Sequence, residues 1–109
     1  MNRSAFLAAA LVLAAAPALA QEIDPGLGRT IALNTCSACH RIDAEPDGPS
    51  PNPNAPRFAD IAKMPSATAL SIGVFLRSTH PTMPNFNLGQ EEIDSLASYI
   101  LGLARPQTR

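Results

Sequence analysis

Residues 36–40 of this chain read Cys36-Ser37-Ala38-Cys39-His40, a C-x-x-C-H pattern. Side chains three positions apart lie on the same face of a helical turn, so the two thiols can each add to one of the two vinyl groups along the edge of a haem. The histidine directly after the second cysteine can then bind the iron. The pattern therefore indicates covalent attachment of a c-type haem, and with it a redox protein.

Three other uses of the two cysteines are possible. A thioredoxin-like redox pair needs neighbouring strands, and the sequence predicts none. A zinc site needs four ligands, and the cysteines and histidines of the chain are Cys36, Cys39, His40 and His80, with an awkward adjacency at Cys39-His40. A structural disulfide gives His40 no role. Haem attachment is the interpretation that uses all three residues of the motif.

The first twenty residues have the pattern of a secretory signal peptide. Arg3 gives a short basic start, an uncharged apolar run covers residues 5–16, and residues 17–20 (PALA) end in an A-x-A-like cleavage site. The run is shorter than the roughly 20 residues of a membrane-spanning helix. We expect cleavage after Ala20, a periplasmic location, and one mature domain over residues 21–109.

The expected mature chain is small and slightly acidic. It carries seven Lys and Arg residues against nine Asp and Glu residues, and Lys63 is its one lysine. No basic patch is evident, so nucleic acid and anionic membranes are not expected as partners, and we expect no membrane insertion. Ten prolines and no tryptophan leave a thin core for a domain of this size. A haem would supply the missing apolar centre.

The first half of the mature chain predicts helices around a proline-rich loop. We expect a helix from Asp24 to His40, with Asp24 as its cap and Pro25 at its first position. The segment Arg41–Pro56 holds five prolines in sixteen residues, which excludes a regular helix or an interior strand. Residues 56–63 are expected to form a short helix that carries Phe58 and Ile61.

The second half predicts two longer helices joined by a loop. The first runs from Ser66 to near Ser78, with an apolar face of Leu70, Val74 and either Phe75 or Leu76. The loop, residues 80–88, carries Met83. Gly89 opens the last helix, and Glu92 stands three residues on. Its apolar positions recur on one helical face: Ile93, Leu96, Ala97, Ile100, Leu101 and Ala104.

The sixth ligand of the iron has three candidates, namely Met64, Met83 and His80. Methionine opposite histidine is common in electron-transfer cytochromes, where it raises the reduction potential. Met83 stands in a loop between Pro81 and Pro84, which stiffen the backbone around it. We therefore favour Met83 as the distal ligand, with an open site, His80 and Met64 as alternatives.

From Gly28 to Leu103 the chain resembles the small class I c-type cytochromes of bacterial periplasms. The resemblance rests on the Cys36–His40 motif, on Met83-Pro84 before the last helix, and on Leu96-Ala97-Ser98-Tyr99 within it. It implies an all-α fold of about three to four helices wrapped around one covalently bound haem c. It further implies His40 as the proximal iron ligand, Met83 as the distal ligand, and Cys36 and Cys39 as the tethers.

The family also implies a close crossing of the first and last helices. Gly28, eight residues before Cys36, stands where the family places a glycine that lets the two backbones touch, and Leu96 and Tyr99 match the residues that face it. A proline carbonyl in the family accepts a hydrogen bond from the proximal histidine. Pro56 matches it best, and Pro49 is the rival.

Three features depart from the family. Ala32 stands where an aromatic residue is common, four positions before the first cysteine. The haem-burying tryptophan of mitochondrial members is absent, and so is the ring of lysines with which those members dock. A strongly acidic docking partner is therefore not expected.

Our hypothesis is a monomeric carrier that passes single electrons between redox proteins. We expect an apolar haem shell formed by Phe58, Leu70, Phe75, Phe86, Leu96 and Ile100. No catalytic residues are expected, because no acid–base pair or nucleophile array stands out. The alternatives are a haem-based sensor or ligand-binding protein with a labile sixth site, and a dedicated electron-transfer subunit of a periplasmic dehydrogenase or oxidase.

Overall fold

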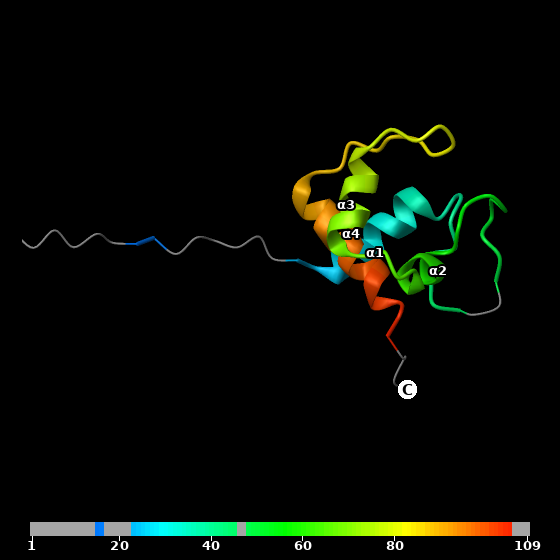
Figure 1. The fold of residues 1–109 in the computed structure, drawn as a ribbon, viewed down its shortest axis with the longest axis horizontal. Helices are drawn as coiled ribbons and strands as arrows, with labels where there is room; N and C mark the ends of the chain where they lie inside the picture. The colour runs from blue at the N-terminus through cyan, green and yellow to red at the C-terminus, as the bar shows by residue number, and fades with distance from the viewer. Residues whose placement is uncertain (1–14, 17–22, 46–47, 106–109) are drawn as a thin grey trace, which may run out of the picture.

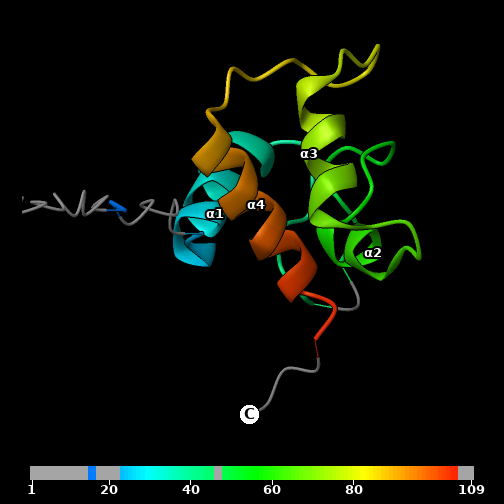
Figure 2. The same ribbon diagram turned by 60° about the vertical axis from the view of Figure 1, so that its left-hand side comes forward.

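The computed structural model describes residues 15–16, 23–45 and 48–105. Its elements are α1 (Pro25–Ile31), the π-helical turn η1 (Ala32–Cys36), α2 (Phe58–Lys63), α3 (Ala69–Arg77) and α4 (Gln90–Gly102). No strand occurs in these ranges, so the expected all-α fold is confirmed. The last helix is central, because it contacts each of the other three α-helices (Figures 1 and 2).

The start of α1 follows from its N-cap, Asp24, and its first residue, Pro25. The Asp24 carboxylate accepts a hydrogen bond from the Gly26 amide at 2.8 Å, and Pro25 occupies the first helical position, where its missing N–H costs nothing. The helix predicted from Asp24 to His40 is confirmed as far as Cys36, although its last turn is π-helical. Residues 37–40 form a turn and not the end of a regular helix, closed by a hydrogen bond from the His40 amide to the Cys36 carbonyl.

Helices α1 and α4 cross at very close range. A Cβ built on Gly28 would overlap the backbone carbonyl of Ser95 and lie 2.9 Å from the Cβ of Tyr99, so only glycine fits. The prediction placed Leu96 and Tyr99 opposite Gly28, and the nearest atoms instead belong to Ser95 and Tyr99. Leu96, which is 1% exposed, packs in the core.

The crossing is filled in spite of the small residue at position 32. Ala32 is fully buried, and the hydroxyl of Ser95 accepts a hydrogen bond from the Asp24 amide at 3.2 Å. Ser95 is itself fully buried. The start of α1 is therefore held to the middle of α4 by a polar contact as well as by packing.

Helix α4 confirms its predicted start and most of its predicted face. Gly89 is the N-cap residue, and the Glu92 carboxylate accepts a hydrogen bond from the Gly89 amide at 2.7 Å, which satisfies a donor at the helix start. Ile93, Leu96, Ala97 and Ile100 are buried. Leu101 is half-buried, while Ala104 lies beyond the helix and is exposed.

Helix α2 begins two residues later than predicted, at Phe58. The Phe58 amide donates to the Arg41 carbonyl at 2.9 Å, and Phe58, Ala59 and Ala62 are buried. The preceding proline-rich segment is irregular where it is described, as five prolines require.

Two predictions for α3 were wrong. The helix starts at Ala69 and not at Ser66, because Thr68 is its N-cap and forms a reciprocal capping box with Ser71. Its expected inner face was also misplaced, since Leu70 and Val74 are exposed while Ile72 is buried. Residues 69–76 are apolar on nearly every face, so their spacing could not identify the face that packs inward.

The predicted signal peptide, residues 1–20, and its cleavage site lie outside the described residues apart from Ala15 and Ala16. No helix in the part of the chain that the structure describes is long and apolar enough to span a membrane. The boundary of the mature domain at residue 21 stays a prediction.

The helix crossing gives a first testable prediction. Gly28→Ala should lower the free energy of unfolding of the holoprotein by about 1–3 kcal/mol, because the new methyl group forces the backbones of α1 and α4 apart. Denaturant titration followed by circular dichroism measures this. Gly102→Ala is the matched control, since nothing lies within 4 Å of its added Cβ. Equal stability of Gly28→Ala and wild type would contradict a backbone-to-backbone crossing.

Candidate functional site

A largely apolar cavity of about 350 Å³ lies among η1, α2, α3 and α4. The predicted site residues Cys36, His40 and Met83 all line it. The other lining residues come from the segment before α2, from the helices and from the α2–α3 connection: Pro56, Phe58, Ile61, Met64, Ser66, Ala67, Ser71, Ile72, Phe75, Leu76, Leu96 and Ile100. The fold thus brings the C-x-x-C-H motif and the Met83 loop to one apolar space.

Two contacts of its ring hold His40 at the cavity wall. Its Nδ1 lies 2.7 Å from the carbonyl oxygen of Pro56, and because a carbonyl only accepts, Nδ1 carries the proton. The ring also packs at 45° to that of Phe58, with centroids 5.2 Å apart. The structure therefore identifies Pro56, and not Pro49, as the hydrogen-bond partner. Nε2 is left as the nitrogen that can bind a metal, and the Nδ1 bond raises its basicity.

The two cysteines differ in their surroundings. Cys36 is buried and lines the cavity, and burial raises the pKa of its thiol to about 11, so the thiol is neutral at physiological pH. Cys39 is exposed and is not among the lining residues. Its amide donates to the Cys36 carbonyl at 3.1 Å, so both cysteines belong to one turn at the edge of the cavity.

The structure narrows the choice of a distal ligand. Met83 and Met64 both line the cavity, whereas His80 is not among the lining residues and stacks on the ring of Phe75. Met64 is 52% exposed and Met83 is half-buried. Met83 and Met64 are therefore the candidate ligands that the structure places at the cavity wall.

The expected apolar shell was right in four of its six members. Phe58, Phe75, Leu96 and Ile100 line the cavity. Leu70 lies on the exposed side of α3, and Phe86 lines a separate hollow with Leu88 and Ile93. Apolar residues that the expected shell left out also line the cavity, among them Ile61, Ile72 and Leu76. A correct inner face for α3 would have included Ile72.

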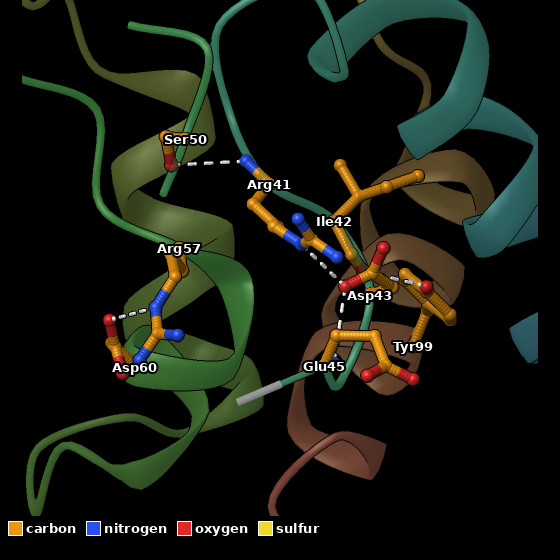
Figure 3. Close-up of polar contacts among 8 residues, drawn as sticks. All are labelled: Arg41, Ile42, Asp43, Glu45, Ser50, Arg57, Asp60 and Tyr99. Carbon is orange, nitrogen blue, oxygen red and sulfur yellow. Dashed lines mark hydrogen bonds and ion pairs between the residues drawn. The ribbon is translucent and has the colours of Figure 1, made fainter. Parts of the chain in front are cut away.

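The segment that follows His40 forms hydrogen bonds with two other parts of the chain, as Figure 3 shows. The hydroxyl of Ser50 accepts from the Arg41 amide at 3.0 Å, and the hydroxyl of Tyr99 donates to the Ile42 carbonyl at 2.7 Å. Burial raises the pKa of Tyr99, which keeps this donor protonated. Residues 41–42 are thereby linked to the proline-rich segment and to α4. Ser50 could not be predicted, because a single serine in a loop belongs to no pattern.

Charged side chains around this segment pair locally and away from the cavity. Arg41 donates to Asp43 at 2.9 Å, and Arg57 donates to Asp60 at 2.7 Å (Figure 3). The hydrogen bond from each arginine lowers the pKa of its aspartate. None of these four residues lines the cavity, whose lining includes no Asp, Glu, Lys or Arg side chain.

The zinc alternative finds no support in the geometry. Among the described residues, no three His, Cys, Asp or Glu side chains gather where they could hold a metal ion. His80, the ligand that a zinc site would need, is engaged with Phe75 instead.

A comparison with known families adds to these observations. The Cytochrome c family model matches residues 26–104 of the chain, which include the C-x-x-C-H motif, the cavity and α4. The chain belongs to the cytochrome c family. It is therefore a haem-containing electron-transfer protein whose haem c is bound covalently, and it has redox partners. No curated protein and no solved structure matches the chain significantly.

The residues present fit a covalently attached haem. The cavity walls are largely apolar, as a flat porphyrin requires, and Cys36 is buried at the wall beside His40. The Nδ1 bond to Pro56 orients the His40 ring and leaves Nε2 free. Cys36, Cys39 and His40 are the residues that would hold the group, and Met83 or Met64 would supply a further ligand from the cavity wall.

The tie between Ser50 and Arg41 can be tested with a matched pair of variants. Ser50 and Ser95 are the buried polar residues of the described core, and each accepts a hydrogen bond from a backbone amide. Replacing either by alanine should cost about 1–3 kcal/mol of stability, because an amide loses its partner. Only Ser50→Ala should also speed exchange of the His40 ring proton, measured by proton NMR of the holoprotein. Identical exchange in both variants would show that the Ser50–Arg41 hydrogen bond does not help to hold the neighbouring His40 ring.

Proposed function

We propose that the chain is a periplasmic monohaem cytochrome that transfers single electrons between redox proteins. In this proposal Cys36 and Cys39 tether one haem c, His40 binds the iron on the proximal side, and Met83 binds it on the distal side. The observation that carries the proposal is that His40, with Nδ1 bonded to Pro56, and Met83 line the same apolar cavity.

The protein's own residues are arranged to favour a fast and reversible one-electron step. The haem iron supplies a couple between its ferrous and ferric states. Phe58, Leu96 and Ile100 keep water from the cavity, which raises the reduction potential. The bonds from Pro56 and Ser50 hold His40 and its neighbour in one arrangement. A fixed ligand set changes little between the two oxidation states, so reorganisation is small.

We favour Met83 over Met64 as the distal ligand because of the backbone that carries it. Pro81 and Pro84 lie on either side of Met83 and reduce the number of conformations that the loop can adopt when it is unfolded. Met64 follows the end of α2 and exposes about half of its surface. We therefore assign Met64 to apolar packing at the cavity wall.

Two alternatives make different predictions. A haem-based sensor would keep a labile sixth site, and Met83 on the cavity wall argues against it. A dedicated subunit of a dehydrogenase or oxidase would co-purify with that enzyme, whereas a free carrier would purify alone as a monomer. Members of the family typically carry electrons, and we propose that this chain likewise has no enzymatic reaction of its own.

The partners should be redox proteins that dock briefly through a small interface. The proposed mature chain, residues 21–109, carries seven basic against nine acidic residues and one lysine. This charge balance argues against nucleic acid and anionic membrane surfaces as partners, and against a strongly acidic docking face.

The distal ligand is tested by Met83→Ala. The oxidised variant should lose the near-infrared methionine–iron band, and its reduction potential should fall, because a thioether opposite histidine raises the potential. Met64→Ala is the control and should keep the band. Absorption spectra and a redox titration of the purified holoproteins measure both effects. A band that survives in Met83→Ala and disappears in Met64→Ala would assign the distal site to Met64.

Export is tested by the first residue of the purified protein. The full chain, expressed in a bacterium that exports proteins and attaches haem c, should be recovered from the periplasm beginning at Gln21, as measured by intact mass. Ala20→Arg should block cleavage, because the site requires a small residue at that position. The same change at Leu19 should be tolerated. A haem-loaded chain that retains residues 1–20 would contradict the signal peptide.

A further inference from the structure

We propose that His80 is a positioning residue whose ring, stacked on Phe75, holds the loop of residues 79–88 against the cavity and so keeps Met83 in place. This inference rests on the proposed function, in which Met83 is the distal ligand. His80 itself does not line the cavity.

Hydrogen bonds and packing hold the loop near its two ends, and Phe86 lines a hollow with Leu76 and Ile93 of the helices. Before it, the amide of Ser78 donates to the Phe75 carbonyl at 3.1 Å, and its hydroxyl donates to the Val74 carbonyl at 2.7 Å. At its other end, Leu88 packs against the core. In both views the loop extends away from the helices beyond the end of α3 (Figures 1 and 2).

Between its two ends, the backbone of the loop makes few hydrogen bonds. Within the described part of the chain, no hydrogen bond or ion pair joins residues 79–87 to a helix. The amide of Leu88 bonds back to Phe86 at 3.0 Å, inside the loop. The side chains on either side of Met83, from Pro81 to Asn85, are exposed. The position of Met83 therefore depends on its own packing at the cavity wall and on side-chain contacts elsewhere in the loop.

The stack of the His80 ring on Phe75 is such a contact, and it lies close to Met83 in the sequence. The centroids of the His80 and Phe75 rings are 3.5 Å apart, and the ring planes differ by 25°. Phe75 belongs to α3 and lines the cavity, as Met83 does. Only two residues separate His80 from Met83, and one of them, Pro81, has a fixed φ. Pinning the His80 ring to α3 therefore restricts how far Met83 can move from the cavity.

The expected size of the effect follows from the strength of aromatic pairs. Such a pair changes an equilibrium constant by a factor of about 2–10 beyond what its buried area contributes. Loss of the stack should raise the population of the open loop by that factor. An external ligand that competes with Met83 for the iron binds through the open state, so its apparent affinity should rise equally.

The experiment titrates the oxidised holoprotein with imidazole and follows the loss of the near-infrared methionine–iron band. His80→Ala should increase the apparent imidazole affinity about 2–10-fold while the band is intact without imidazole. His80→Phe should stay close to wild type, because a phenyl ring can keep the stack. Thr79→Ala, an exposed neighbour without a ring, should also behave as wild type.

A double-mutant cycle with Phe75→Leu separates the stack from other effects. His80→Ala should raise imidazole affinity in the wild-type background and have little effect once Phe75 is leucine. Unchanged affinity in His80→Ala, or the same increase in His80→Phe and His80→Ala, would overturn the proposed contact. A wild-type protein that lacks the methionine–iron band would instead refute ligation by Met83, and the role of His80 with it.

Discussion

At the crossing of α1 and α4 two helix backbones meet directly, because Gly28 presents no Cβ to the carbonyl of Ser95. Ala32, one turn further along, is fully buried. The close approach fixes where η1 ends relative to α4, and so places Cys36 in the same cavity wall as Leu96 and Ile100. A haem attached through Cys36 takes its position from this crossing, as does His40.

The two sides of the cavity are held with very different strength. On the proximal side, backbone or side-chain hydrogen bonds reach residues 39–42 from Asn52, Ser50, Pro56, Phe58 and Tyr99. On the distal side, residues 79–87 have no hydrogen bond to a helix within the described part of the chain, and prolines and a ring stack take that role. In the proposed ligand set, His40 is therefore held by more hydrogen bonds than Met83 is, and Met83 depends more on the packing of its loop.

The sequence predicted best where a local interaction decides the structure. Asp24 and Pro25 set the start of α1, and the apolar stripe of α4 was right from Ile93 to Ile100 because charged and polar residues occupy its other faces. The sequence predicted poorly where several faces were equally apolar. In α3, Leu70, Val74 and Ile72 are interchangeable by hydropathy, and only packing against α4 shows that Ile72 is inside.

Long-range polar contacts were the other limit of prediction. Ser50 is nine residues from Arg41 in the sequence, and Tyr99 is 57 residues from Ile42. Neither separation matches the repeat of a helix or a strand, so no sequence pattern predicts these hydrogen bonds. Pro56 could be proposed only through the family, since five prolines stand in that segment. These contacts matter because a domain this small, with a cavity of about 350 Å³ at its centre, has little other core. The group that fills the cavity binds only to the folded arrangement of its walls, so its binding free energy also stabilises the fold. The polar ties around His40 and the apolar crossing at Gly28 therefore support cofactor binding and folding together.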